Sequence, residues 1–173
     1  GDVYKRQILC YDIRDLGKQL QPVGMLVVLD SVFNRIIRNR KLGKSTWVYI
    51  DEIYLLFQHE YSANFLFTLW KRVRKYRACC TGITQNVDDL LQSHTARTML
   101  ANSEFLVMLN QAATDRTELA RLLNISDNQL SYITNVGAGH GLIRCSGNLV
   151  PFENSFPRNT KLYRLMTTKP GEA

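Results

Sequence analysis

The chain has 173 residues, 45% of them hydrophobic, which allows one well-buried domain or one piece of a larger domain. Lys and Arg outnumber Asp and Glu by 22 to 15, and the net charge of +7 favours polyanionic partners such as nucleotides, DNA or acidic membrane surfaces. The four cysteines form no CxxC pair, which argues against a zinc site or a disulfide framework and for reduced thiols in a cytosolic protein, and no apolar run reaches the roughly 20 residues that span a bilayer.

The first seven residues, GDVYKRQ, follow neither a helical period nor a strand alternation, and an apolar run begins directly after them. A native domain seldom begins in this way. We therefore expect residues 1–7 to be a non-native or disordered leader, and residues 8–173 to be the C-terminal part of a single domain whose N-terminal portion is missing. A longer reading frame in the source DNA would support this expectation, and a natural start codon just before Gly1 would contradict it.

Four runs are nearly continuous in apolar or small residues, as expected of strands buried on both faces of a parallel sheet. They are ILCYDI (8–13), STWVYID (45–51), ACCTGIT (78–84) and EFLVMLN (104–110). The last third of the chain contains GLIRCSGNLVPF (141–152), in which Ser146-Gly147-Asn148 separates two apolar stretches and predicts a β-hairpin.

Longer segments between these runs have apolar residues spaced three and four apart, which predicts helices. The first runs from Met25 to Ile37, with Pro22 near its start. The second is marked by Leu66, Leu69, Trp70 and Val73, and the third by Leu119, Leu122 and Leu123. Alternation of such helices with buried strands predicts an α/β fold with a mostly parallel sheet and flanking helices.

The segment LGKSTWVYIDEIYLLF (42–57) contains a GKS tripeptide, which also ends the phosphate-binding P-loop pattern GxxxxGK[ST]. A P-loop begins with a glycine and leads from a strand into a helix, whose N-terminal amides face the phosphates. Here Arg38 occupies the position of the first glycine, and Gly43-Lys44-Ser45 leaves a helix and enters a strand. We therefore interpret the tripeptide as a helix end followed by a polar turn.

Two adjacent carboxylates, Asp51 and Glu52, follow the apolar run of the second predicted strand. Such a strand delivers them to the carboxyl edge of a parallel sheet, where ligands bind in open α/β folds. There the first carboxylate can hold Mg²⁺ through water, and the second can orient or deprotonate an attacking water. The alternative is an acidic helix N-terminus that only complements the helix dipole.

The next predicted strand ends in GITQN, which places Gln85 at the same edge as Glu52 if the two strands are neighbours. A neutral amide there can contact a γ-phosphate or position water, although Gln85 could instead cap the following helix. The helix between the two strands carries five cations, Lys71, Arg72, Arg74, Lys75 and Arg77. Taken alone, such a run indicates a solvated face.

In combination these motifs resemble the motor ATPases of conjugative transfer and type IV secretion, the VirB-family ATPases within the HerA/FtsK class of P-loop pumps, in the version carried on mobile elements of Gram-positive bacteria. The resemblance covers nearly everything from Ile8 to the end of the chain. Its segments are CYDIRDLGKQL (10–20), WVYIDEIYLLF (47–57), LWKRVRKYRACCTGITQNVDDLL (69–91), LNQAATDRTELARLLNIS (109–126), GLIRCSGNLVPF (141–152) and LYRLMTTKPGE (162–172). It implies a RecA-like P-loop NTPase fold, incomplete at its N-terminus.

The resemblance implies that Asp51 and Glu52 are the Walker B pair, with Asp51 holding Mg²⁺ through water, and that Gln85 is the γ-phosphate sensor. It further implies that an arginine of the basic helix is offered to the nucleotide of a neighbouring subunit. Arg74 is our preferred arginine finger, and Arg116, at a helix start, is a second intersubunit candidate.

One departure from the family pattern concerns the turn after the basic helix. The family usually has small glycines after the aromatic residue of that helix, whereas this chain has Arg77-Ala78. The aim of Arg74 therefore depends on a turn that the sequence leaves open.

For the parent protein the resemblance implies ATP and Mg²⁺ as cofactors, a homo-hexameric hydrolase, and components of the conjugation or type IV secretion channel as partners, with DNA as a further candidate. It places the motor in the cytoplasm, at the cytoplasmic face of the bacterial inner or plasma membrane. Because this chain lacks a P-loop, we expect it to show no appreciable ATPase activity and weak nucleotide affinity by itself.

Residues 117–133 offer an alternative from another class, a helix-turn-helix regulator without enzymatic activity. Two predicted helices flank a short turn at residues 124–126. A recognition helix contacts phosphates and base edges, but the second helix carries Asp127 and no Lys or Arg, which leaves Asn128 and Gln129 as base readers. Tight, sequence-specific binding in a gel shift at moderate salt would favour this alternative.

Overall fold

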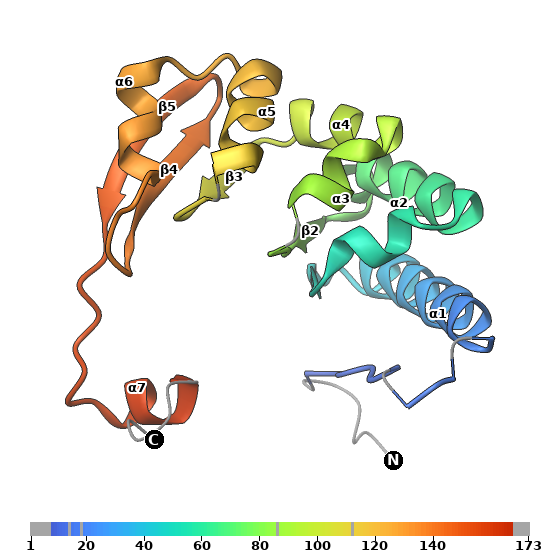
Figure 1. The fold of residues 1–173 in the computed structure, drawn as a ribbon. Helices are drawn as coiled ribbons and strands as arrows, with labels where there is room; N and C mark the ends of the chain where they lie inside the picture. The colour runs from blue at the N-terminus through green and yellow to red at the C-terminus, as the bar shows by residue number, and fades with distance from the viewer. Residues whose placement is uncertain (1–7, 14, 18, 86, 112, 168–173) are drawn as a thin grey trace. The chain divides into compact units, whose positions relative to one another are not determined.

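The computed structural model describes all residues except 1–7, 14, 18, 86, 112 and 168–173 (Figure 1). The predicted leader, residues 1–7, thus lies outside the described residues. The chain divides into two compact units, Gly1–Met99 and Leu100–Ala173, which we call unit one and unit two and describe separately.

Unit one contains a pair of parallel strands together with α-helices and short 3₁₀ helices. In chain order these are α1 (Gln21–Lys41), β1 (Thr46–Ile50), the 3₁₀ helix η1 (Ile53–Phe57), α2 (Glu60–Arg72), the 3₁₀ helix η2 (Val73–Tyr76), β2 (Ala78–Gly82), α3 (Val87–Gln92) and α4 (His94–Ala101), whose last two residues belong to unit two. Strands β1 and β2 pair in parallel, from Thr46 opposite Ala78 to Ile50 opposite Gly82.

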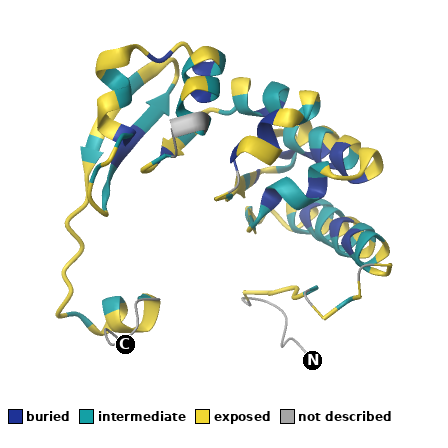
Figure 2. Ribbon diagram, in the orientation of Figure 1, coloured by how far each residue is buried: buried dark blue, intermediate teal, exposed yellow. Residues whose placement is uncertain are grey.

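Helices α1 and α2 pack against each other and supply much of the core of unit one. Ile36 and Leu66 are fully buried, and the rings of Phe33 and Phe65 meet edge to face with centroids 6.1 Å apart. Figure 2 shows buried positions recurring along both helices between exposed ones, as the sequence periodicity predicts. The first two predicted helices are therefore confirmed.

The GKS tripeptide lies where the sequence predicts, in the turn between α1 and β1. Helix α1 ends at Lys41, and three basic residues in its last turn complement the negative end of the helix dipole. Gly43 then adopts a left-handed φ of +71°, which glycine tolerates best, and β1 begins at Thr46. The interpretation of this tripeptide as a helix end rather than a phosphate loop is thereby confirmed.

Residues 8–13, predicted to form a strand, form none. Ile8 is 99% exposed, and the Tyr11 hydroxyl shares a hydrogen bond of 3.0 Å with Ser31 Oγ of α1. An apolar run becomes a buried strand only when neighbouring strands pair with its backbone groups. Within the described part of unit one, the only strand that pairs with β1 is β2.

Unit two contains an antiparallel sheet and three short helices before a C-terminal helix. Its elements are β3 (Phe105–Met108), α5 (Ala113–Leu123), α6 (Asp127–Leu130), the 3₁₀ helix η3 (Ser131–Ile133), β4 (His140–Cys145), β5 (Asn148–Glu153) and α7 (Lys161–Met166). The strand order is β3-β4-β5, and both pairings are antiparallel. The prediction that residues 104–110 belong to a parallel sheet is therefore wrong, because β3 pairs with the first strand of the hairpin.

The predicted hairpin is confirmed as β4 and β5, joined at Ser146 and Gly147. Both residues have positive φ, 47° and 84°, the pattern of the type I′ turn whose twist matches that of paired strands. Ile133 of η3 and Leu142 of β4 are fully buried and form the centre of this unit. Parallel strands with flanking helices and a C-terminal hairpin together confirm the predicted α/β class.

Candidate functional site

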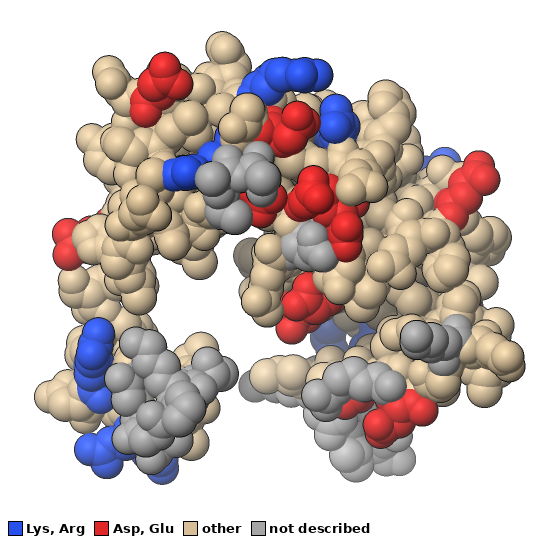
Figure 3. Space-filling model, viewed as in Figure 1, with Lys and Arg blue, Asp and Glu red and all other residues tan. Residues whose placement is uncertain are grey.

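The carboxyl ends of β1 and β2 bring together three of the residues that the sequence singles out. The two strands are direct neighbours, and their ladder continues past Ile50, whose carbonyl accepts a 2.8 Å hydrogen bond from the N–H of Ile83. Just beyond it, Gln85 Nε2 donates a hydrogen bond of 3.3 Å to Glu52 Oε1. Gln85 and Asp51 are exposed and Glu52 is half-buried. Figure 3 shows acidic side chains gathered over the region of α3 and the end of β2.

The backbone at Glu52 is left-handed, with φ 48° and ψ 47°. This conformation costs a residue other than glycine roughly 1–2 kcal/mol, and such strain persists only where the surroundings fix it. Two features fix this conformation. The Glu52 N–H donates a hydrogen bond of 3.0 Å to Asp51 Oδ1, and the next residue, Ile53, is buried.

Gly82 allows Ile53 to reach its buried position, a role that the sequence reading missed. A Cβ atom at Gly82 would lie 2.5 Å from Ile53 Cδ1, closer than side chains approach. Ile53 N–H also donates to the Ile83 carbonyl at 3.0 Å, which ties the residue after Glu52 to the end of β2. The available signal was a glycine inside an otherwise apolar strand, which often marks a close backbone approach.

The donor set at this edge suits a cation that is shared with phosphates. Within the described residues there is no group of three or more His, Cys, Asp or Glu side chains that could hold a metal ion. Mg²⁺ usually keeps several waters and binds through one or two carboxylates plus substrate phosphates. Asp51, exposed beside Glu52, fits that kind of site and does not form a cage of protein ligands.

Arg74 is exposed in η2, which leads into the start of β2. Five strand residues separate that end of β2 from the end near Gln85, a distance of about 16 Å at about 3.3 Å per residue. The structure therefore does not bring Arg74 to Glu52 within unit one. Arg77 ends the turn with a left-handed φ of 53°. Glycine, which is typical of the family here, adopts this conformation more easily, but the turn also forms with arginine.

Arg116 lies in unit two, half-buried near the start of α5. It therefore belongs to a different unit from Glu52. Its predicted position at a helix start is confirmed, whereas its predicted role stays a prediction.

The segment predicted as a helix-turn-helix has a second helix of only four residues, α6, followed by a 3₁₀ turn. The Gln129 side chain accepts hydrogen bonds of 3.0 Å from both Ser126 N and Ser126 Oγ, as part of a capping box. A helix of one turn cannot present several side chains along the major groove, and one of the two candidate base readers is already engaged. The two predicted helices on either side of residues 124–126 are confirmed as α5 and α6, but α6 is a single turn, and the DNA-binding role of this alternative stays a prediction.

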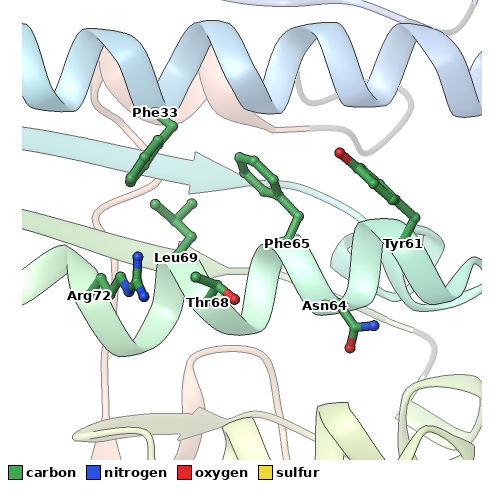
Figure 4. A pocket seen from close by; sticks show the side chains of 7 residues that line it. All are labelled: Phe33, Tyr61, Asn64, Phe65, Thr68, Leu69 and Arg72. Atoms are coloured by element: carbon green, nitrogen blue, oxygen red, sulfur yellow. The ribbon is translucent and has the colours of Figure 1, made fainter.

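Unit one contains two cavities whose linings do not include the candidate site residues. One of about 310 Å³ lies between α1 and α2, where Phe33 and Phe65 reach into the gap between the helices (Figure 4). The other, of about 360 Å³, is lined by residues of η1 and α3, among them Tyr54 and Asp89. Asp51, Glu52 and Gln85 line neither of these two cavities.

Among the described residues, no helix is both long enough and apolar enough to cross a membrane.

Comparisons with known proteins agree on one kind of domain. Residues 2–141 match the model of a family described as the TraG P-loop domain. Among solved structures, the chain is similar to that of VirB4 from Thermoanaerobacter pseudethanolicus, with a TM-score of 0.75 and 24% sequence identity. The match covers 84% of this chain but only 40% of the VirB4 chain, so it shows a shared fold over less than half of that protein. No curated protein sequence matches the chain.

Proposed function

Because this chain belongs to the TraG P-loop domain family, we propose that it is the C-terminal part of an ATPase domain that powers conjugative DNA transfer or type IV secretion. The observation that carries the proposal is the pairing of Gln85 with Glu52, beside Asp51, at the carboxyl ends of two adjacent parallel strands. Residues that act on the γ-phosphate of a P-loop NTPase belong at this edge. The fold shared with VirB4 supports the assignment to a secretion motor.

The side chains at this edge divide the work of hydrolysis in the proposed mechanism. The half-buried Glu52 carboxylate orients a water molecule for in-line attack and accepts its proton. The Gln85 amide contacts the γ-phosphate with its Nε2 donor, and its link to Glu52 couples phosphate recognition to the position of the water. The exposed Asp51 carboxylate would hold Mg²⁺ through its hydration shell, and the ion, bound together with ATP, would neutralise charge on the phosphates.

The loop that binds the β- and γ-phosphates is proposed to lie in sequence outside this chain. The 173 residues contain no GxxxxGK[ST], and Gly43-Lys44-Ser45 is a helix end. The purified chain is therefore expected to release no phosphate from ATP above background. Robust Mg²⁺-dependent hydrolysis by this chain would mean that the site is misplaced.

The parent protein is proposed to work as a homo-hexamer, docked on channel components at the cytoplasmic face of the membrane. An intersubunit role for Arg74 is supported by its position, because it is exposed near the end of β2 that lies opposite Gln85. It would stabilise charge that develops on the nucleotide of a neighbouring subunit. Arg116 is the second candidate for this role.

The decisive experiment uses a longer form of the protein that contains the P-loop. Replacing Glu52→Gln is expected to lower kcat by about 10²- to 10⁴-fold, the usual contribution of a general base, while nucleotide affinity is retained. Gln85→Ala should lower kcat as well, whereas Gln92→Ala, an exposed glutamine of α3, serves as the matched control. Unchanged turnover in Glu52→Gln would remove Glu52 from the mechanism.

A further inference from the structure

The cavity between α1 and α2, which we call the helix pocket, is lined by none of the residues that the proposed mechanism uses. Its volume of about 310 Å³ lies at the lower end of the range for small-molecule sites. Helix α2 contributes six lining residues between Tyr61 and Arg72, and α1 contributes Phe33. Those of α2 recur three and four residues apart, so they lie on one face of the helix over a length of about 16 Å.

Three apolar side chains give the helix pocket its shape. Leu69 is buried, and Phe33 and Phe65 are half-buried. The Phe33 ring meets two other rings edge to face, that of Phe65 with centroids 6.1 Å apart and that of Tyr76 with centroids 5.7 Å apart. Figure 4 shows Phe33 and Phe65 reaching into the space between the two helices. These contacts within the protein form the apolar walls without a ligand, as in most small-molecule sites.

The other four lining residues are polar and exposed: Tyr61, Asn64, Thr68 and Arg72. Arg72 is the only charged residue of the lining, and it forms no ion pair with a described residue. The sequence contains no Asp or Glu from residue 31 to residue 50 or from residue 61 to residue 87. The positive charge at this end of the helix pocket is therefore not compensated by the segments that surround it.

We propose that the helix pocket binds a small organic anion in which an aromatic body carries one acidic group, a carboxylate or a sulfonate. The Arg72 guanidinium donates charge-assisted hydrogen bonds to the acidic group. The aromatic body packs against the rings of Phe33 and Phe65, in the edge-to-face or offset arrangements that aromatic pairs prefer. The ligand thus matches both the apolar walls and the single unpaired cation.

A nucleotide fits the helix pocket less well than such a monoanion. Its phosphates carry several negative charges, and the lining offers one cation. Phosphate sites also use backbone amides at a glycine-rich turn or at the N-terminus of a helix. The lining contains no glycine, and Arg72 is the last residue of α2.

The test titrates the full chain with anilinonaphthalene sulfonate, an aromatic anion whose fluorescence rises in apolar surroundings. Phenylnaphthylamine, which has the same rings without the sulfonate, reports binding in the absence of charge. Arg72→Gln removes the cation, and Thr68→Phe fills the helix pocket from an exposed position. The matched control is Lys71→Gln, because Lys71 is the adjacent cation of α2 and its Nζ lies over the Phe67 ring, outside the lining. Circular dichroism verifies that each variant folds.

The two dyes are expected to respond differently to the loss of Arg72. Arg72→Gln should weaken binding of the sulfonate dye by about three- to tenfold, a modest effect because the guanidinium is exposed, and should leave phenylnaphthylamine binding unchanged. Thr68→Phe should weaken binding of both dyes, and Lys71→Gln of neither. The proposal is overturned if the sulfonate dye does not bind, if Arg72→Gln and Lys71→Gln have equal effects, or if Thr68→Phe leaves both dyes bound.

Two further titrations define the ligand and the setting. Naphthoate, a carboxylate, should displace the sulfonate dye at lower concentration than uncharged naphthalene methanol; equal displacement would contradict the role of the charge. The longer form of the protein should bind the dye as this chain does. Loss of binding there would show that another segment of the parent fills the helix pocket, and would overturn the proposal. Because no measurement involves ATP hydrolysis, these outcomes are independent of the proposed ATPase function.

Discussion

Glu52 and Arg77 both hold a left-handed backbone conformation, one at the end of β1 and the other at the start of β2. The Arg77→Gly variant is expected to raise the free energy of unfolding by about 0.5–1 kcal/mol, because relief of the left-handed cost exceeds the extra entropy of glycine in the unfolded chain. Urea denaturation measures the effect. The matched control is Lys75→Gly, two residues earlier at negative φ in η2, which should lower stability by a similar amount. Destabilisation by Arg77→Gly would show that this turn depends on the arginine side chain.

The Cys80 thiol of β2 is expected to make the stability of the chain depend on pH above pH 9. Burial, with a smaller contribution from Cys79, raises the pKa of the Cys80 thiol from 9.0 to about 12. Between these values the unfolded chain loses a proton that the folded chain keeps, so the free energy of unfolding should fall as pH rises, by at most about 1.4 kcal/mol per pH unit. Below pH 9 this contribution to stability is fully present.

Denaturation of three proteins across that pH range isolates the contribution of Cys80. Cys80→Ser should flatten the decline relative to the unmodified chain, since serine does not titrate there. Cys79→Ser should leave most of the decline in place because Cys79 is exposed. Equal slopes in all three proteins would show that Cys80 titrates normally in the folded chain.

At the level of single residues, the sequence predicted which side chains meet at the candidate site but not how they are held. Strand direction alone places Asp51, Glu52 and Gln85 at one edge, once β1 and β2 are taken as neighbours. The left-handed turn at Glu52 and the close fit of Ile53 over Gly82 depend on the packing of two strands against η1. The glycine in this apolar run signals a close approach, but no local pattern identifies Ile53 as the residue that makes it.

Among the elements, α2 supplies a large part of the core of unit one. Leu66 on its inner side is fully buried, and Leu66→Ala is expected to cost about 2–5 kcal/mol through lost contacts and the cavity left behind. Leu165→Ala in α7 makes the same chemical change at a position that is 73% exposed, and it should alter stability by less than about 0.5 kcal/mol. Chemical denaturation compares the two, and equal effects would contradict the packing described for α2.

The elements also show where sequence periodicity succeeds. Helix α1 has 21 residues, and its existence follows from the sequence because apolar residues from Met25 to Ile37 recur on one face. Residues 8–13 and 104–110 carry only short apolar runs, which cannot specify a pairing partner. The first forms no strand, and the second pairs antiparallel with β4. Both predictions failed for the same reason: the pairing of a strand depends on segments that are distant in the sequence.

At the scale of the whole chain, each unit has a hydrophobic centre of its own, around Leu66 in unit one and Ile133 in unit two. Both tryptophans, Trp47 and Trp70, lie in unit one. Tryptophan fluorescence should therefore follow the unfolding of unit one, whereas far-ultraviolet circular dichroism reports on both units. We expect Leu66→Ala to shift the fluorescence transition, because Leu66 lies in the core of unit one. Ile133→Ala should leave the fluorescence transition in place and shift only the part of the dichroism transition that comes from unit two. A shift of the fluorescence transition by Ile133→Ala would show that the two units unfold together.

The turn at Gly43 and Lys44 also affects how experiments on this chain are interpreted. Replacing the lysine of a GKS motif is the usual way to prepare an inactive control of a P-loop enzyme. In this chain Lys44 is an exposed cation, and the turn that carries it joins a helix to a strand. A Lys44→Ala protein would therefore not serve as an inactive control. Any defect would reflect lost surface charge, while the sheet edge that carries Asp51, Glu52 and Gln85 would remain intact.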